Sequence, residues 1–256
     1  MNKIIDDLLS MIHRENKKIY IWFRDDDAGI DSDALKKLVY FFDTHSIPLL
    51  VAVIPERLTI GTTTLLNSSS IVSIGQHGYS HINYAPEGSP PSELTDGRDI
   101  QILTKEQLQG HAILKKYFND KYLHCFIPPY FEISTKVLSE LEKIDYTFFS
   151  SWWTNGFTPN GIPELNVQVD FVDWNNGEKF AGDEYVLFQF QRELENFLLS
   201  KQKRCIIGVV LHHELMDLES YYMLESIYKY AQKNKFTIIS SQTALSYLQN
   251  EGKCNN

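Results

Sequence analysis

Cysteine and positive charge are both scarce in this chain. Only Cys125, Cys205 and Cys254 occur, an odd number at wide spacings without a CxxC pair. This pattern excludes a disulfide framework and indicates a reducing compartment. The 24 basic residues are outnumbered by 33 acidic ones, for a net charge of −9. That balance argues against nucleic acid or an anionic membrane as the main partner.

Long apolar runs are lacking as well. The longest covers residues 47–55, far too short for a membrane span. Residues 1–18 mix acidic and basic side chains with regularly spaced Ile and Leu, which predicts an amphipathic helix and not a signal peptide. We therefore expect a cytoplasmic protein without membrane insertion. Nothing in the sequence indicates its oligomeric state.

The chain has no internal repeat, low-complexity tract or linker, which predicts a single domain over residues 1–256. Short apolar runs predict strands at 19–23, 48–54, 71–74, 123–127, 147–151, 166–172, 205–211 and 236–240. Helical patterns lie between most of them. One begins after Ser32 and another after Thr104, which forms a candidate capping box with Gln107. The others cover residues 134–144, 183–199, 218–234 and 241–249.

This alternation of strand and helix is the pattern of an α/β fold with a parallel sheet. About seven to eight strands in one domain favour a distorted (β/α) barrel over an open doubly wound sheet. Two segments rich in Pro and Gly, 85–99 and 155–164, predict long loops. Such loops in a compact domain are usually functional or disordered.

Three groups of metal-binding or proton-shuttling residues follow predicted strands: Asp25-Asp26-Asp27, His77 with His81, and His212-His213. Each group alone has an ordinary explanation: a solvated acidic loop, two surface histidines, a buried core histidine. Residues four apart share one face of a helix, so His77 and His81 suit one metal ion. The carboxyl ends of barrel strands are where barrel active sites lie. The three groups together therefore predict a metal-dependent hydrolase.

The order of these motifs resembles that of the polysaccharide deacetylases, carbohydrate esterase family 4, also called the chitin-deacetylase-like group. The resemblance covers residues 19 to about 215. Its five motifs are matched, in order, by Asp26-Asp27, His77 with His81, Pro128-Pro129-Tyr130, Asp170 with Asp173 and Trp174, and Leu211-His212. It implies a distorted barrel that removes acetyl groups from N-acetylated sugars with one divalent metal.

The resemblance also implies roles for single residues. Asp26 is the expected catalytic base, and the expected metal ligands are Asp27, His77 and His81. His212 is the expected acid, oriented by a carboxylate such as Asp173. A backbone N–H near Tyr130 is expected to face the substrate oxygen. The expected sugar contacts are Tyr130, Trp152, Trp153, Trp174 and His213. Core packing is the alternative for the aromatic residues, and it explains Trp153 equally well.

The sequence departs from the family pattern at two places. Ile127 stands where the third motif normally has an Arg that holds the catalytic Asp, and Ala28 replaces a glycine. Arg24 is the candidate replacement for the missing charge, because it precedes Asp26 by two residues and side chains two apart on a strand share a face. The register with Asp25 as base and Asp26 as ligand stays open.

Two imidazoles and one carboxylate suit Zn²⁺ best, with Co²⁺, Ni²⁺ or Mn²⁺ as alternatives. The expected partner is an acetylated sugar or glycan precursor, since a polymer outside the cell does not fit a cytoplasmic protein. Two other functions stay open. The same ligand set occurs in non-haem Fe(II) oxygenases, which are usually built on a different, all-β fold. A catalytically impaired relative that only binds a glycan would also tolerate the loss of the Arg.

Overall fold

The computed structural model describes residues 2–152, 162–233 and 235–253. Its helices are α1 (Lys3–Arg14), α2 (Asp33–His45), α3 (Ile60–Ser68), α4 (Ile100–Phe118), α5 (Thr135–Leu141), α6 (Asp183–Leu199), α7 (Leu218–Gln232) and α8 (Ser241–Lys253). Its strands are β1 (Lys18–Ala28), β2 (Leu49–Val53), β3 (Val72–His77), β4 (Tyr122–Ile127), β5 (Phe148–Phe149), β6 (Val169–Asp170), β7 (Val172–Asp173), β8 (Lys179–Phe180), β9 (Arg204–His212) and β10 (Thr237–Ile238).

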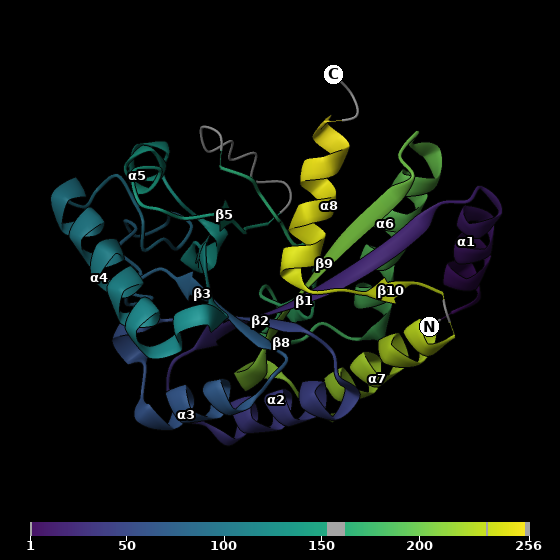
Figure 1. Ribbon diagram of the computed structural model, residues 1–256, viewed down its shortest axis with the longest axis horizontal. Helices are drawn as coiled ribbons and strands as arrows, with labels where there is room; N and C mark the ends of the chain where they lie inside the picture. The colour runs from purple at the N-terminus through teal and green to yellow at the C-terminus, as the bar shows by residue number, and fades with distance from the viewer. Residues whose placement is uncertain (1, 153–161, 234, 254–256) are drawn as a thin grey trace.

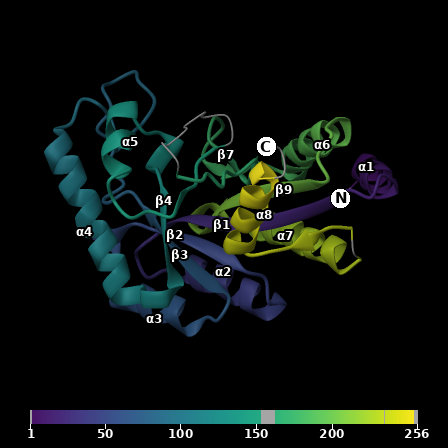
Figure 2. The same ribbon diagram turned by 45° about the horizontal axis from the view of Figure 1, so that its top comes forward.

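One eight-stranded sheet organises the chain. Its strands follow the order β5-β4-β3-β2-β1-β9-β6, and β10 pairs with the first half of β1. All of these pairings are parallel. Figures 1 and 2 show α2, α3 and α7 along one side of the sheet, with α4 and α5 at the β4–β5 end and α1 and α6 at the other. The sheet therefore curls into an open half-barrel.

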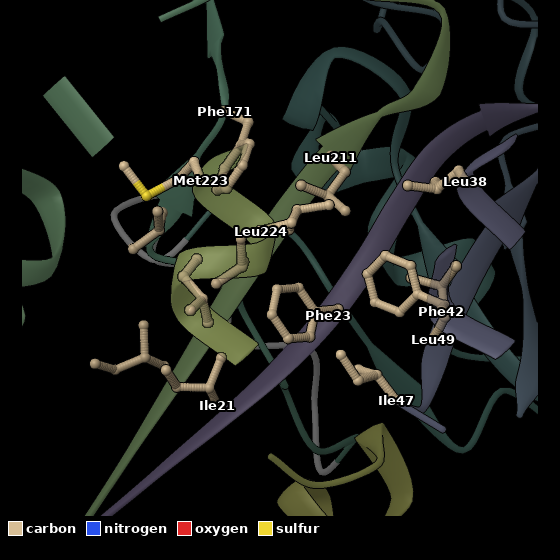
Figure 3. Packing of buried hydrophobic residues seen from close by; sticks show 14 of the residues in the cluster. Ile21, Phe23, Leu38, Phe42, Ile47, Leu49, Phe171, Leu211, Met223 and Leu224 are labelled. Atoms are coloured by element: carbon tan, nitrogen blue, oxygen red, sulfur yellow. The ribbon is translucent and has the colours of Figure 1, made fainter. Parts of the chain in front are cut away.

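The larger hydrophobic core lies between the sheet and the helices on its outer face. Phe23 of β1 packs edge-to-face on Phe42 of α2, with ring centroids 5.3 Å apart. Figure 3 shows Phe23 between the side chains of α2 and Leu224 of α7, with Leu211 of β9 close by. Odd-numbered residues of β1 thus face the helices, and its even-numbered residues face the inside of the half-barrel, as the period of a strand requires.

A second hydrophobic core fills the inside of the half-barrel. It contains Trp22 of β1 and Cys125 and Ile127 of β4, all buried. Trp22 needs a glycine on the neighbouring strand, because a Cβ at Gly208 would lie 2.8 Å from its ring. Arg24 and Asp26 follow Trp22 on the same face, so the polar site begins directly above this apolar layer.

The predicted α/β fold, a distorted barrel of parallel strands, is confirmed, and in this chain the barrel is open on one side. Ser32 caps α2 by accepting a hydrogen bond from the Leu35 N–H. The predicted cap at Thr104 was wrong. Helix α4 begins one turn earlier, because the side chain of Asp99 accepts from the backbone of Gln101 and Ile102. The predicted strand at 166–172 is divided into β6 and β7. None of the described helices is long and apolar enough to cross a membrane.

Candidate metal centre and active site

The three carboxylates at the end of β1 do not share one face. In the pairing of β1 with β9, Asp26 lies opposite His212 and Asp25 opposite Leu211. Side chains at one register position of neighbouring strands share a face, so Asp26 and His212 both face the inside of the half-barrel. Asp25 faces the helices. Asp27 has left-handed backbone geometry, φ 71°, which ends the regular alternation.

Asp27, His77 and His81 meet at one point. Oδ1 of Asp27 lies 3.1 Å from Nε2 of His77 and 3.1 Å from Nε2 of His81. The three ligand atoms all lie within 4.8 Å of one another. Ligands on a tetrahedral ion with bonds of about 2.1 Å are roughly 3.4 Å apart. The spacing of this cluster is therefore compatible with a divalent metal ion.

The protonation chemistry of the cluster fits a metal as well. Nδ1 of His77 lies 3.1 Å from the carbonyl oxygen of Ile127. Donation to that carbonyl leaves the lone pair on Nε2, which is the arrangement found around metal-ligating histidines. Burial alone would raise the pKa of Asp27, but its contacts with His77 and His81 prevail and hold this pKa below its usual range. Asp27 is therefore an anion facing two imidazoles.

The sequence predicted that the two histidines share a helical turn, and this prediction was wrong. His77 is the last residue of β3, and His81 lies in the loop that follows. Gly78 and His81 both have φ of 56°, so the loop turns back on itself through left-handed backbone. A Cβ at Gly78 would lie 2.5 Å from both Glu93 and Pro129, so only glycine fits there. The loop, and not a helix, brings the second imidazole to Asp27.

Glu93 holds this loop in place, and sequence reasoning missed it. Its fully buried carboxylate accepts hydrogen bonds from the backbone N–H groups of Tyr79, Ser80 and His81, at 2.8, 3.3 and 2.7 Å. Glu93 lies in the predicted loop 85–99, so the only available signal was a lone carboxylate in a long loop near the histidines. A buried carboxylate with three N–H partners serves as the anchor of the loop that carries His81.

Replacing Glu93 with Ala should lower the free energy of unfolding by about 3 kcal/mol, because buried backbone N–H groups lose their acceptor. Metal affinity should fall roughly tenfold to a hundredfold, since His81 loses its support. Urea denaturation and metal titration measure the two effects. Glu87→Ala, an exposed change in the same loop, should shift stability by no more than about 0.5 kcal/mol. Equal behaviour of the two variants would contradict the anchoring role.

Arg24 is fully buried and binds Asp26 in the bidentate way. Nε donates to Oδ1 at 2.8 Å and Nη2 donates to Oδ2 at 2.9 Å. Its third nitrogen, Nη1, donates to the Ser150 hydroxyl at 2.6 Å. The contact expected between Arg24 and Asp26 is present. An Arg fork of this kind fixes a carboxylate in direction as well as in charge.

Ile127, at the position where the family pattern has an Arg, supplies no positive charge to Asp26. Its side chain points into the apolar inside of the half-barrel, where a Cβ at Gly75 would lie 2.4 Å from it. Ile127 is fully buried and belongs to the apolar layer. The positive charge beside Asp26 therefore originates two residues earlier on its own strand.

His212 is positioned by aromatic packing. Its ring meets Trp174 edge-on, with centroids 4.7 Å apart. Trp174 in turn donates from Nε1 to Oδ2 of Asp170 at 2.8 Å. Burial raises the pKa of Asp170, and the nearby His212 counteracts that rise. Asp170 is therefore the carboxylate that supports His212, through Trp174.

Asp173, which we expected to orient His212, does not reach it. Its carboxylate lies near the surface and accepts from the backbone N–H groups of Asn175 and Asn176 and from the Asn176 side chain. Among the described residues, Nδ1 of His212 has no hydrogen-bond partner. The roles of Asp170 and Asp173 therefore differ from our expectation. The chain turns between β6 and β7, and only Asp170 stays on the inner side of the half-barrel.

His213 pairs with Asp25 on the helix side of the sheet. Its Nδ1 lies 2.8 Å from Oδ2 of Asp25, and its backbone N–H donates to Oδ1 at 2.9 Å. Both side chains are buried. Burial lowers the pKa of His213, but Asp25 overcomes this effect and raises it. The pair fastens the end of β9 to the end of β1, although His213 also borders the cavity described next.

A cavity of about 440 Å³ opens over these residues at the carboxyl ends of the strands. Its polar lining includes Asp26, Asp27, His81 and His212. A second cavity of about 280 Å³ adjoins it and shares Tyr130 and Trp174 with the first. The site therefore has a polar centre and a neighbouring hollow.

No sequence-family model matches the chain, and no curated protein matches it by sequence. Solved structures do match. A putative polysaccharide deacetylase from Mycobacterium smegmatis superposes with a TM-score of 0.65 at 14% identity, over 93% of this chain and 92% of that one. A family 4 acetyl xylan esterase from Clostridium thermocellum, in complex with a cobalt ion, gives 0.55 at 14%, over 89% and 91%. The chain has the fold of carbohydrate esterase family 4.

A third match with the family 4 fold is a pseudoenzyme from Bacillus anthracis, with a TM-score of 0.59 at 12% identity, over 90% of this chain and 66% of that one. The fold alone therefore does not decide activity, and the side chains must.

Of the aromatic residues expected to meet a sugar, Tyr130 and Trp174 line both cavities, whereas Trp152 lines only the second. Trp153 and most of the loop predicted at 155–164 lie outside the described residues.

Proposed function

We propose that this protein is a metal-dependent hydrolase that removes an N-acetyl or O-acetyl group from a carbohydrate, as a divergent relative of the family 4 esterases. One observation carries the proposal: Asp27 and His81 of a candidate metal triad, an Arg-paired carboxylate and a histidine border one cavity at the carboxyl ends of the strands. A glycan-binding protein would need the cavity, but it would need neither a base nor an acid.

Asp27, His77 and His81 would hold the ion, and Zn²⁺ suits two imidazoles and a carboxylate best. Once bound, a divalent ion polarises a carbonyl oxygen and makes water a stronger acid. The protein supplies the geometry around it. The Ile127 carbonyl fixes the tautomer of His77, and Glu93 fixes the loop that carries His81. Both contacts hold the two histidines in place.

Asp26 is our candidate for the general base. Arg24 donates to both oxygens of Asp26, and the next residue, Asp27, belongs to the candidate metal triad. Asp26 would therefore take the proton of the attacking water at a fixed place. His212 is the candidate acid that would protonate the departing amine or alcohol. Its register position opposite Asp26 supports this role, because both then face the same substrate. A backbone N–H near Tyr130 would donate a hydrogen bond to the substrate oxygen.

The two adjoining cavities favour a substrate larger than one acetyl group. Tyr130 and Trp174 line both cavities and could contact a sugar ring, and Trp152 and Tyr185 extend the aromatic lining of the second cavity. We propose a soluble, nucleotide-linked or lipid-linked acetamido sugar, in keeping with the cytoplasmic location predicted from the sequence. Asp173 and Glu132 in the second cavity disfavour an anionic group at that end.

Acetate release by the zinc-loaded protein tests the function. The substrates to compare are N-acetylglucosamine oligomers, a nucleotide-linked N-acetyl sugar and an acetylated xylan fragment. Activity on any of them that is lost with a chelator and restored by Zn²⁺ would support the proposal. Zinc-loaded protein that binds these sugars and releases no acetate would instead support the glycan-binding alternative. The Fe(II) oxygenase alternative is less well supported, because such sites are usually built on a different, all-β fold.

Replacing Arg24 with Met should lower kcat by roughly tenfold to a hundredfold, the effect typical of losing a residue that supports a catalytic group. KM should change little, because Arg24 lies below the cavity and does not line it. Arg24→Lys should recover part of the loss, since it keeps the charge without the fork. Arg14→Met, an exposed change on α1, is the control. Near-normal kcat in folded Arg24→Met would show that the site manages without this partner.

A further inference from the structure

A second cluster of metal-binding side chains lies outside the cavity. His111 comes from α4, His124 from β4, and Asp145 from the connection between α5 and β5. His124 precedes the end of β4 by three residues. Its strand neighbours Tyr122 and Phe126 belong to the cores on the helix side of the sheet, not to the core inside the half-barrel. The cluster therefore sits near α4, in the part of the molecule at the β4–β5 end of the sheet in Figure 1.

The distances in this cluster match those of the first one. Nε2 of His111 lies 3.0 Å from Oδ1 of Asp145, and Nδ1 of His124 lies 3.4 Å from its Oδ2. The three ligand atoms lie within 4.8 Å of one another, and the two imidazole rings are 4.9 Å apart. Ligands on a tetrahedral ion are roughly 3.4 Å apart. One ion between the three side chains would need only a small adjustment.

A buried hydrogen-bond chain orients His111 toward Asp145. Nδ1 of His111 lies 2.9 Å from the Tyr122 hydroxyl, which donates to Oε1 of Gln76 at 3.2 Å. With Tyr122 donating to Gln76, its oxygen accepts from Nδ1 of His111, and the lone pair stays on Nε2. A partner of this kind behind a ligating imidazole is typical of metal sites.

The backbone of His124 also sets this side chain apart. Its φ of 50° is left-handed, inside a strand whose pairing with β3 shifts register between Ile74 and Gln76. A bulge of this kind redirects a side chain. The ordinary explanation is a histidine–carboxylate pair at the surface, like His45 with Glu225 at 3.1 Å. That pair belongs to no three-ligand cluster among the described residues, whereas Asp145 faces two imidazoles.

We propose that His111, His124 and Asp145 form a second divalent-metal site of the zinc type, separate from the catalytic one. Three protein ligands would leave a fourth position for water, and Asp145, whose side chain is 68% exposed, would give solvent access to the ion. The ion would join α4, β4 and the segment before β5, so its role is to fasten the β4–β5 end of the sheet. The inference does not rest on the proposed hydrolysis, because none of these residues lines either cavity.

Zinc stoichiometry of the untagged protein tests the site, with Zn²⁺ as the probe and elemental analysis after dialysis as the readout. The wild type should hold two equivalents per chain and Asp145→Asn one. A His77→Ala/His81→Ala variant, which lacks the first site, should retain one equivalent and lose it when Asp145→Asn is added. His45→Asn, which removes the other surface pair, should leave every count unchanged.

A second readout does not depend on the first site. Zn²⁺ should raise the thermal midpoint of His77→Ala/His81→Ala, because an ion that binds only the folded state stabilises it, and Asp145→Asn should abolish that rise. His124→Asn should act like Asp145→Asn while tolerating the left-handed backbone, which Asn adopts more readily than most residues. Unchanged zinc counts and midpoints in Asp145→Asn would overturn the second site.

Discussion

His77→Ala/His81→Ala is expected to lose one equivalent of metal and all measurable hydrolysis. The two imidazoles, whose Nε2 atoms both lie beside Oδ1 of Asp27, supply two of the three candidate ligands, and a single carboxylate binds a divalent ion weakly. Without the ion, the substrate carbonyl is not polarised and water remains a poor nucleophile. The loss should appear in kcat and should not be rescued by added Zn²⁺.

The control for this variant is His13→Ala/His45→Ala. His13 is exposed on α1, and His45 contacts Glu225 far from the cavity. Two histidines are removed in each protein, so a general effect of histidine content on metal recovery cancels. We expect the control to keep its metal and its activity. Equal metal content in the two double variants would refute the assignment of the catalytic ligands.

Folding of the active-site double variant must be checked in the same experiment. His77 is buried and contacts the Ile127 carbonyl, so its removal leaves space and an acceptor without a donor. His77→Gln retains a polar side chain of similar length and is the milder alternative. Near-native circular dichroism together with lost metal would separate ligand loss from unfolding.

The sequence predicted the elements that position the site because strand ends are visible in an apolar pattern. Runs of buried apolar residues placed the Asp triplet and His212 toward the carboxyl ends of β1 and β9, although β1 continues through the triplet to Ala28 and was predicted only as far as residue 23. The contact of Arg24 with Asp26 was predictable for the same reason, since a period of two places both on one face. Local periodicity is thus enough wherever neighbouring residues on one strand decide the geometry.

The remaining contacts depend on how separate segments meet, and local patterns carry no such information. Glu93 reaches the loop that carries His81 from a long connection whose path has no periodicity. Asp170 replaces Asp173 as the support of His212 because the chain turns between two very short strands. The pairing of Asp25 with His213 depends on the register between β1 and β9, which no single strand specifies.

The second large effect expected is a loss of activity in Asp26→Asn and a loss of stability in Asp25→Asn. Asp26→Asn should lower kcat by about 10²- to 10⁴-fold, the usual contribution of a general base, because an amide cannot take the proton of the attacking water. Metal should stay bound, since Asp27 and not Asp26 belongs to the ligand cluster. His212→Ala should match this loss if the leaving group needs a proton.

Asp25→Asn should show the opposite pattern. Asp25 holds His213 through its imidazole and its backbone N–H, on the face of the sheet turned away from Asp26. Losing a charge from this buried pair should lower the free energy of unfolding by about 2 kcal/mol. Because Asn can still accept the backbone N–H, the end of β9 should stay in place and kcat should fall less than tenfold.

Kinetics, metal content and urea denaturation on the same two proteins distinguish the two possible registers of the triplet. With Asp26 as base, activity and stability are lost in different variants, because the two carboxylates serve opposite faces of one strand. If Asp25→Asn is instead the inactive protein and Asp26→Asn loses its metal, the motif must be moved by one residue. In that case the bond between Arg24 and Asp26 would support a metal ligand, and His213, already paired with Asp25, would become the candidate acid.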